Sequence, residues 1–262
     1  MSERPLAGRR IVVTRPREQA AGLEARIREA GGESVLIPAI EIRDLAELGP
    51  FDAIAARLEA FDCAIFVSPI AVRKAMARLR VQRGARPWPP ALRVAAIGRG
   101  SQRALQEAGI APVLVPPARA DSEALLAMPE FLRPAGQRIV IFRGRGGRDL
   151  LGETLAERGA RVEYAECYAR AMPAPATDAL GGDHGVPGAI DAVTVSSGEG
   201  LANLHALLDD RGREQLRGTP LFVPHARVAE QAAALGARKV TIAGPGDAEM
   251  LDALVAYFRS VE

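Results

Sequence analysis

The sequence predicts an α/β protein with two doubly wound units, each a parallel sheet covered by helices on both faces. The first observation is that short apolar runs alternate with segments whose apolar residues recur at helical spacing. The second is an internal duplication that covers most of the chain. The third is size, because 262 residues with 48% hydrophobic residues suffice for two domains with separate cores.

The duplication is clearest at residues 138–159, which align without a gap to residues 10–31. Both segments read as an apolar strand, a turn with Arg, and a helix stopped by glycine. Residues 62–79 match 191–208, and residues 121–128 match 247–254, at nearly the same separation. Three blocks in the same order and at a nearly constant distance indicate that one α/β unit was duplicated.

Apolar runs in the first half predict strands at 10–14, 35–37, 63–67, 94–97 and 112–115. Pro16 favours the start of a helix, which Gly31 ends. Further helices are predicted at 52–61, at 71–79, from Gly98–Ser101 to near Gly109, and from a cap at Asp121 or Ser122.

The second half repeats this alternation, with strands predicted at 139–142, 162–168, 192–195, 221–223 and 240–243. Leu151 and Leu155 lie at helical spacing before Gly159, and helices are also predicted at 198–208, before Gly236, and at 247–258. Residues 172–188 are rich in Pro, Gly and Ala and are predicted to form a linker.

Composition narrows the function classes. The net charge is +2, aromatic residues are only 4%, and the Arg residues are dispersed, which argues against a nucleic-acid partner. Glycine-rich segments 98–103 and 144–149 lack the third glycine of a dinucleotide fingerprint, and neither has a P-loop lysine. Neither an apolar signal segment nor a membrane span is recognisable, and Cys63 and Cys167 are isolated, so a cytoplasmic protein with free thiols is expected.

Ligands of doubly wound sheets bind at the carboxyl ends of the strands. The loops predicted there combine small residues, hydroxyls and Arg at helix starts, where backbone N–H groups and the helix dipole favour anions. For any single loop, the alternative to an anion site is that its residues only form the turn and cap the helix. The loops are Thr14–Arg17, Ser68–Pro69, Gly98–Ser101, Arg143–Arg148, Ser196–Gly198 and Pro224–Arg227.

Candidate acid–base groups are few. His184 lies in the predicted linker, His205 on a helix, and only His225 in a candidate loop, so neither a metal set nor a catalytic triad is predicted. Tyr168 ends a predicted strand beside the linker and is the phenol best placed to face a cleft between the domains. A packing role for Tyr168 remains the alternative.

Five segments together resemble the uroporphyrinogen-III synthase family. They are VVTRP at 12–16, FVSPIAV at 66–72, AIGRGSQRALQEAG at 96–109, GARVEYAECYAR at 159–170 and VSSGEGL at 195–201. The resemblance implies two flavodoxin-like doubly wound parallel-sheet domains, interleaved in sequence and joined by two linkers. The first domain is expected at 1–38 plus 173–262 and the second at 43–169, with linkers at 39–42 and 170–172.

The resemblance also implies an activity: a lyase that dehydrates and closes hydroxymethylbilane, a linear octacarboxylate tetrapyrrole, with inversion of the last pyrrole ring. It implies a haem-biosynthesis enzyme that uses no cofactor or metal and binds its substrate in the interdomain cleft. Tyr168 matches the tyrosine favoured as general acid in the family. The predicted substrate-binding residues are Thr14, Arg15, Ser68, Gly98, Ser101, Arg143, Ser196, Ser197, Gly198 and His225.

Two other functions remain open from the sequence. A non-catalytic sensor or small-anion binding module could use the same two domains, and a flavodoxin-type electron carrier is a third reading, although aromatic platforms for a flavin are scarce. A monomer with neither a nucleic-acid nor a membrane partner is expected.

Overall fold

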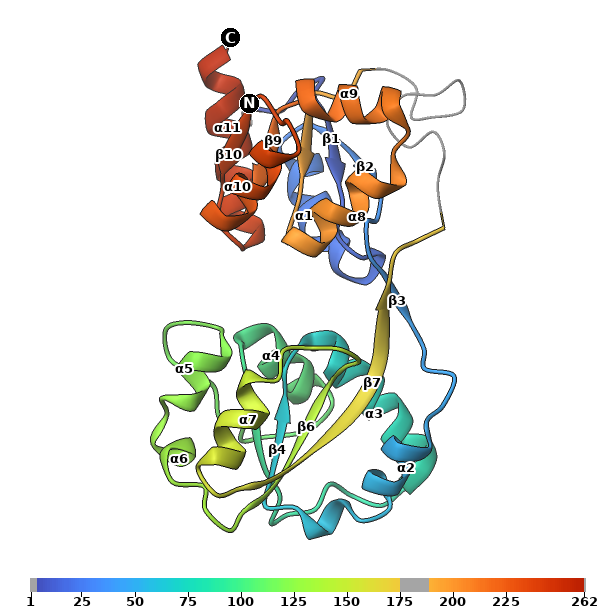
Figure 1. Ribbon diagram of the computed structural model, residues 1–262, viewed down its shortest axis with the longest axis vertical. Coiled ribbons are helices and arrows are strands. Elements are labelled where there is room, and N and C mark those ends of the chain that lie inside the picture. Colours follow the sequence, from blue (N-terminus) through green and yellow to red (C-terminus); the bar gives the residue numbers. More distant parts are fainter. Residues whose placement is uncertain (1–3, 175–188, 262) are drawn as a thin grey trace. The chain divides into compact units, whose positions relative to one another are not determined.

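The computed structural model describes residues 4–174 and 189–261, and the chain divides into two compact units (Figure 1). Unit 1 consists of Met1–Glu41 and Ala171–Glu262, and unit 2 of Ile42–Arg170. Each unit contains one five-stranded sheet. His184 and residues 175–188 of the predicted linker lie outside the described residues.

The sheet of unit 1 has the strand order β10-β9-β8-β1-β2, and its strands pair in parallel. Read from β2, the order is second, first, third, fourth and fifth along this unit, which is the flavodoxin-like winding. The strands are β1 (Arg10–Val13), β2 (Glu33–Leu36), β8 (Ala192–Thr194), β9 (Leu221–Val223) and β10 (Val240–Ile242).

Helices cover both faces of this sheet because successive strand residues point to opposite sides. Ile11 and Val13 pack on one face with α1 (Arg17–Glu29) and α11 (Asp247–Val261). Val12 packs on the other face with the helices α8 (Gly198–Leu207), α9 (Asp210–Gly218) and α10 (Ala226–Ala234).

The sheet of unit 2 has the order β3-β7-β6-β4-β5, and β7, β6, β4 and β5 pair in parallel. These four strands repeat the arrangement of β2, β1, β8 and β9, so both copies of the duplicated sequence contribute to each sheet. The strands are β3 (Glu41–Arg43), β4 (Cys63–Phe66), β5 (Arg93–Ala96), β6 (Arg138–Gly144) and β7 (Arg161–Ala171).

The core of unit 2 also has two layers. Ile139 and Ile141 pack under the helices α5 (Ser122–Leu126), α6 (Pro129–Leu132) and α7 (Leu150–Glu157). On the opposite face, the ring of Phe142 stacks on Phe66 with centroids 4.5 Å apart and meets Phe51 edge-on at 5.9 Å. That layer contains α2 (Gly49–Ala55), the short 3₁₀ helix η1 (Leu58–Ala60), α3 (Pro69–Arg83) and α4 (Arg99–Glu107).

Two predicted elements differ from the structure, and one helix of the structure was not predicted. The strand expected at 112–115 is reduced to one bridge between Leu114 and Ala95, since the flanking prolines have no N–H to donate. The helix expected at 52–61 is split into α2 and η1. Helix α9 was not predicted, because Leu216 is its only buried large apolar residue and no apolar stripe marks it.

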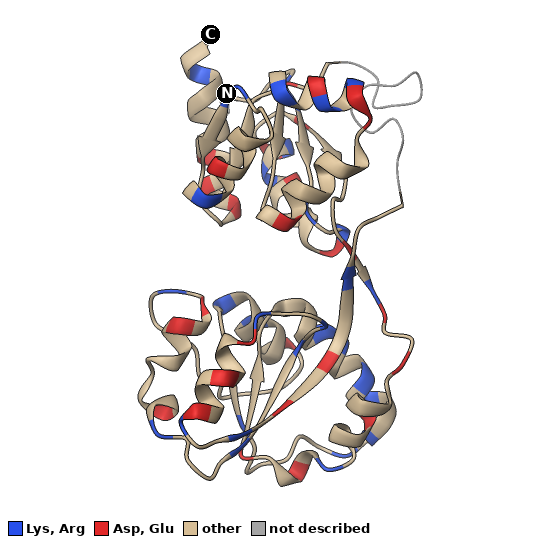
Figure 2. Cartoon of the chain, viewed as in Figure 1, with Lys and Arg blue, Asp and Glu red and all other residues tan. Residues whose placement is uncertain are grey.

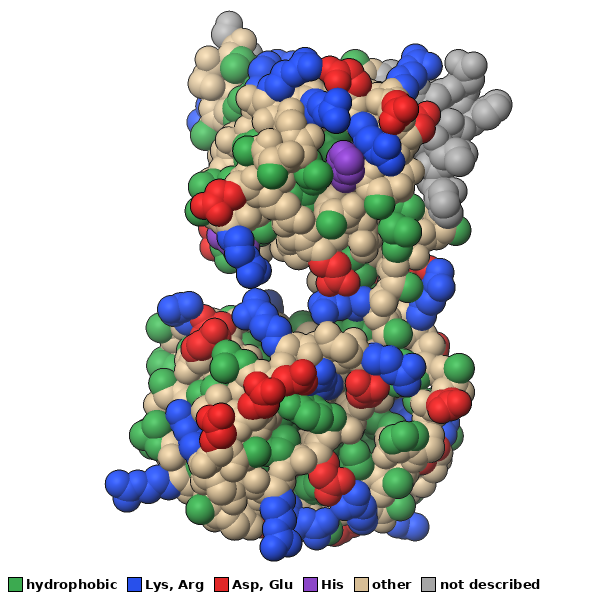
Figure 3. Space-filling view, in the orientation of Figure 1, with side chains coloured by type: hydrophobic (Ala, Val, Ile, Leu, Met, Phe, Trp, Pro, Cys, Tyr) green, Lys and Arg blue, Asp and Glu red, His purple; other side chains and the backbone are tan. Residues whose placement is uncertain are grey.

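Charged residues are spread over both units, with acidic and basic residues interspersed along the helices and loops (Figure 2). The face in Figure 3 shows the same mixture, with apolar side chains among the charged ones. Among the described residues, no helix is long and apolar enough to cross a membrane.

Candidate functional site

The candidate loops of unit 2 lie at the carboxyl ends of four neighbouring parallel strands. Ser68 follows β4, Gly98 follows β5, Gly144 ends β6, and Tyr168 lies near the end of β7. Because parallel strands end at the same edge of a sheet, these residues gather at one edge, as expected for a ligand site of this fold.

A register shift in β7 aims the side chain of Tyr168. Arg143 pairs with Glu166, but the next residue, Gly144, pairs with Tyr168, so Cys167 is an extra residue in β7. Side chains normally alternate between faces along a strand, and an extra residue interrupts this alternation. Such bulges bend a strand and redirect one side chain. The bulge therefore turns the phenol of Tyr168 across the end of β6.

One hydrogen bond holds the phenol at the sheet edge, and two more hold the groups on either side of it. The hydroxyl oxygen of Tyr168 lies 3.2 Å from the hydroxyl oxygen of Ser68, and either hydroxyl can be the donor. The Ser68 oxygen also accepts a 3.0 Å hydrogen bond from the backbone N–H of Ala71, which caps α3. The backbone carbonyl of Tyr168 accepts from the N–H of Arg145 at 2.7 Å. Tyr168 is 6% exposed.

The absence of a side chain at Gly144 makes room for this ring. A β-carbon at position 144 would lie 2.8 Å from Cε2 and Cζ of Tyr168 and 3.2 Å from its hydroxyl. Those distances are too short for carbon atoms in contact, so any side chain there would move the ring. Gly144 was not among the predicted site residues, although the glycine-rich segment that contains it was.

The first turn of α4 presents backbone donors at the same edge. Gly98 caps this helix without a side-chain hydrogen bond, and its carbonyl accepts from the N–H of Gln102 at 3.1 Å. Within the described residues, nothing accepts from the N–H groups of Arg99, Gly100 and Ser101. Unpaired N–H groups at a helix start attract anions. Ser101 itself is buried.

In unit 1, the predicted binding residues Thr14, Ser197 and Gly198 have structural partners. The Thr14 hydroxyl donates to the carbonyl of Thr194 at 2.8 Å, which ties β1 to β8. Ser197 caps α8 by accepting from the N–H of Gly200 at 3.0 Å. Ser196 is half-buried beside it. The carbonyl of Gly198 accepts from the Gln231 amide at 3.0 Å, a contact that the sequence did not predict.

His225 begins α10 in an extended conformation and is exposed. Its carbonyl accepts from the N–H of Val228 at 3.0 Å, and among the described residues nothing accepts from the N–H groups of Ala226 and Arg227. The start of α10 therefore offers unit 1 the same kind of backbone donors that the start of α4 offers unit 2.

The two predicted arginines are held by internal partners. Arg15 forms an ion pair with Asp247 at the start of α11, a partner that the sequence did not single out. Arg143 is 7% exposed, pairs with Asp149 at 2.9 Å and donates to the carbonyl of Gly147 at 2.6 Å. The Arg143 guanidinium thus folds the loop after β6. A role of either arginine in binding substrate carboxylates stays a prediction.

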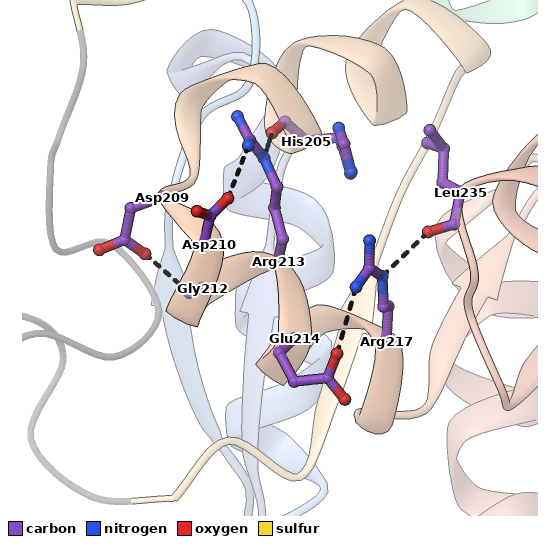
Figure 4. Close-up of polar contacts among 8 residues, drawn as sticks. All are labelled: His205, Asp209, Asp210, Gly212, Arg213, Glu214, Arg217 and Leu235. Atoms are coloured by element: carbon purple, nitrogen blue, oxygen red, sulfur yellow. Dashed lines mark hydrogen bonds and ion pairs between the residues drawn. The ribbon is translucent and has the colours of Figure 1, made fainter.

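The remaining titratable groups lie elsewhere. Burial raises the pKa of the Cys63 and Cys167 thiols to about 12, so both stay protonated at neutral pH. On α8, burial and then the neighbouring Arg213 and Arg217 lower the pKa of His205 (Figure 4). In the described part of the chain, no group of three His, Cys, Asp or Glu residues could hold a metal ion.

Residues 21–252 match the family model of uroporphyrinogen-III synthase HemD. The chain belongs to the uroporphyrinogen-III synthase family. It is 37% identical to the uroporphyrinogen-III synthase of Salmonella typhimurium over 245 residues, which cover 92% of this chain and 97% of that protein. The Escherichia coli uroporphyrinogen-III synthase is 34% identical over the same length and coverage. The family predicted from sequence motifs is therefore confirmed.

Solved structures of uroporphyrinogen III synthases share the fold. A mutant enzyme from the extremely thermophilic bacterium Thermus thermophilus aligns with a TM-score of 0.62 at 21% identity, covering 97% of this chain and 100% of that chain. The Helicobacter pylori enzyme aligns with a TM-score of 0.59 at 13% identity, covering 95% of this chain and 99% of that one. These likenesses confirm the predicted two-domain α/β fold.

A Gly144→Ala variant is expected to lower the synthase activity by about 10- to 100-fold, because misplacing a reacting group by about 1 Å costs that much. The new methyl group would displace the Tyr168 ring. Gly147→Ala is the matched control, since its nearest neighbour would be Arg143 Nε at an ordinary 3.4 Å. Initial rates and thermal unfolding of both variants test this, and full activity in folded Gly144→Ala would contradict it.

Proposed function

We propose that this chain dehydrates and closes hydroxymethylbilane to uroporphyrinogen III with inversion of the last ring, and is therefore a carbon–oxygen lyase. The observation that carries the proposal is the match of residues 21–252 to the family model, joined by relatives that align over nearly their whole length. The phenol at the carboxyl edge of the unit 2 sheet and the N–H groups beside it supply the chemistry that this reaction needs.

The departing hydroxyl needs a proton, since water leaves far more readily than hydroxide. Tyr168 is the proposed general acid, because its hydroxyl lies at the carboxyl end of the sheet and is oriented by Ser68 at 3.2 Å. The substrate C–O bond breaks, the Tyr168 proton completes the water molecule, and ring closure later releases one proton that restores the phenol. The net change is therefore the loss of one water molecule from the substrate.

Recognition of an octacarboxylate requires many anion contacts. We assign these to the backbone N–H groups at the starts of α4 and α10, with the exposed Arg99 and Arg227 beside them. Each unit thus offers one such set of donors. Unassisted closure gives the isomer without inversion, so the main contribution of these contacts is orientation of the last ring before it reacts.

None of these steps calls for a metal or a nucleotide, and a single chain carries every group named. We propose a monomer that acts in the cytoplasm. The free thiols of Cys63 and Cys167, both buried, support a reducing compartment.

The test is incubation with enzymatically generated hydroxymethylbilane, followed by separation of the type I and type III porphyrin isomers. Type III product above background, retained in the presence of a chelator, is expected. Type I product alone, or loss of activity on chelation, would overturn the proposal. Binding without any turnover would instead identify a small-anion sensor of the same fold.

A further inference from the structure

We propose that Ser68 is a positioning residue that donates its proton to the phenol oxygen of Tyr168 and so turns the Tyr168 proton towards the substrate. The inference rests on the proposed function, because it states which hydroxyl donates in the hydrogen bond between Ser68 and the proposed acid Tyr168. All atoms involved belong to unit 2.

The direction follows from the bonding capacity of a serine hydroxyl, which has one proton and two acceptor lone pairs. The N–H of Ala71 can only donate, so its 3.0 Å bond to Ser68 occupies one lone pair. The Ser68 proton then needs an acceptor. Among the described residues, the phenol oxygen of Tyr168, 3.2 Å away, is the acceptor within hydrogen-bonding distance. We therefore infer that Ser68 donates and Tyr168 accepts.

This direction leaves the phenol proton available for transfer. Had Tyr168 donated to Ser68, its proton would be shared with serine and turned away from the leaving hydroxyl. With Ser68 as donor, the chain runs from the Ala71 N–H through Ser68 to the Tyr168 hydroxyl and ends at the substrate. Hydrogen bonds aligned in one sense polarise one another, which strengthens the terminal donor.

The same arrangement stabilises Tyr168 after it has given up its proton. The phenolate oxygen accepts a charge-assisted hydrogen bond from Ser68. Ser68 stands at the N-cap of α3, a helix of 15 residues whose N-terminal partial positive charge favours the anion. Ser68 keeps its own proton throughout. The phenolate recovers a proton when the closing ring loses one.

Unit 1 shows that helix capping by serine and contact with a phenol are separate properties. Ser197 is the counterpart of Ser68 and caps α8 through the Gly200 N–H at the same 3.0 Å. At the offset of the first repeat block, the counterpart of Tyr168 is Ile40. A β-carbon on Gly200 would lie 3.9 Å from Ile40 Cδ1, so an apolar side chain occupies this place in unit 1. A capping serine thus does not need a phenol.

The experiment is a double-mutant cycle on the full chain with Ser68→Ala, Tyr168→Phe and the double variant, measured as formation of the type III isomer. Ser68→Ala is expected to lower kcat about 10-fold with little change in KM. In the Tyr168→Phe background, the same change is expected to leave kcat unaltered, because Ser68 acts through the missing hydroxyl. Ser68→Thr keeps the hydroxyl and should restore most of the activity.

Two further variants separate proton donation from helix capping. Ser68→Asp can still accept from the Ala71 N–H but has no proton to give, so it should lose at least as much activity as Ser68→Ala. Asp209→Ala removes the 2.7 Å cap bond to the Gly212 N–H of α9 (Figure 4). It is expected to lower the unfolding temperature and to leave kcat unchanged.

Equal losses from Ser68→Ala in the wild-type and Tyr168→Phe backgrounds would overturn the inference, as would full activity of Ser68→Asp. Wild-type turnover in Tyr168→Phe would also overturn it, while type III product from the unmodified chain would still support the proposed function. Absence of type III product from the unmodified chain would instead reject the proposed function itself.

Discussion

A Tyr168→Phe variant is expected to form uroporphyrinogen III about 100-fold more slowly than the unmodified chain, the loss typical of removing one positioned acid. Phe keeps the ring that packs on Gly144 and removes only the hydroxyl that contacts Ser68. Because the carboxylate-binding groups are untouched, the fall should lie in kcat rather than in KM. Initial rates of type III isomer formation, corrected for spontaneous type I closure, measure the effect.

Tyr164→Phe is the matched control, since Tyr164 is a phenol on the same strand. Its ring lies under the Arg143 guanidinium at 4.4 Å, and burial raises its pKa. The substitution preserves that ring contact, so activity should be retained. If Tyr168→Phe folds and turns over at the normal rate, Tyr168 is a packing residue, and water or the substrate's own carboxylates supply the proton.

A fragment of residues 42–170 is expected to unfold cooperatively on its own, whereas fragments 1–134 and 135–262 are not. The first fragment contains the whole β3-β7-β6-β4-β5 sheet and helices on both of its faces. A cut after residue 134 follows the duplication but removes β6 and β7 from β4 and β5. The fully buried strand β4 would then lose the partner that pairs Cys63 with Ile139.

Thermal unfolding followed by circular dichroism, with the three fragments purified separately, measures this difference. Fragment 42–170 should show a sharp transition, and the other two should show broad, weak changes or aggregate. Sharp transitions for 1–134 and 135–262, with none for 42–170, would contradict the assignment of folding units. That result would also remove the reason to regard the carboxyl end of the unit 2 sheet as a preformed site.

The carboxyl-end loops were the part of the site that could be predicted from sequence. Ser68, Ser197 and Asp121 precede helices and cap them, since a side-chain oxygen next to a free N–H is a local matter of three residues. Helix α9 has the same signal in Asp209 but was missed, because its mostly polar composition hides it from a search for apolar periodicity.

The sequence by itself determined the fold class, the duplication and the family. Apolar runs and glycine stops act over a few residues, so they can be recognised without knowing what packs against them. The family resemblance implied which repeats share a domain, but only the tertiary structure decided the register of the strands and which groups meet. Strand pairing depends on contacts between distant segments, and the bulge at Cys167 shifts the register by one residue. That shift brings the Tyr168 hydroxyl to Ser68, a contact that no local pattern contains.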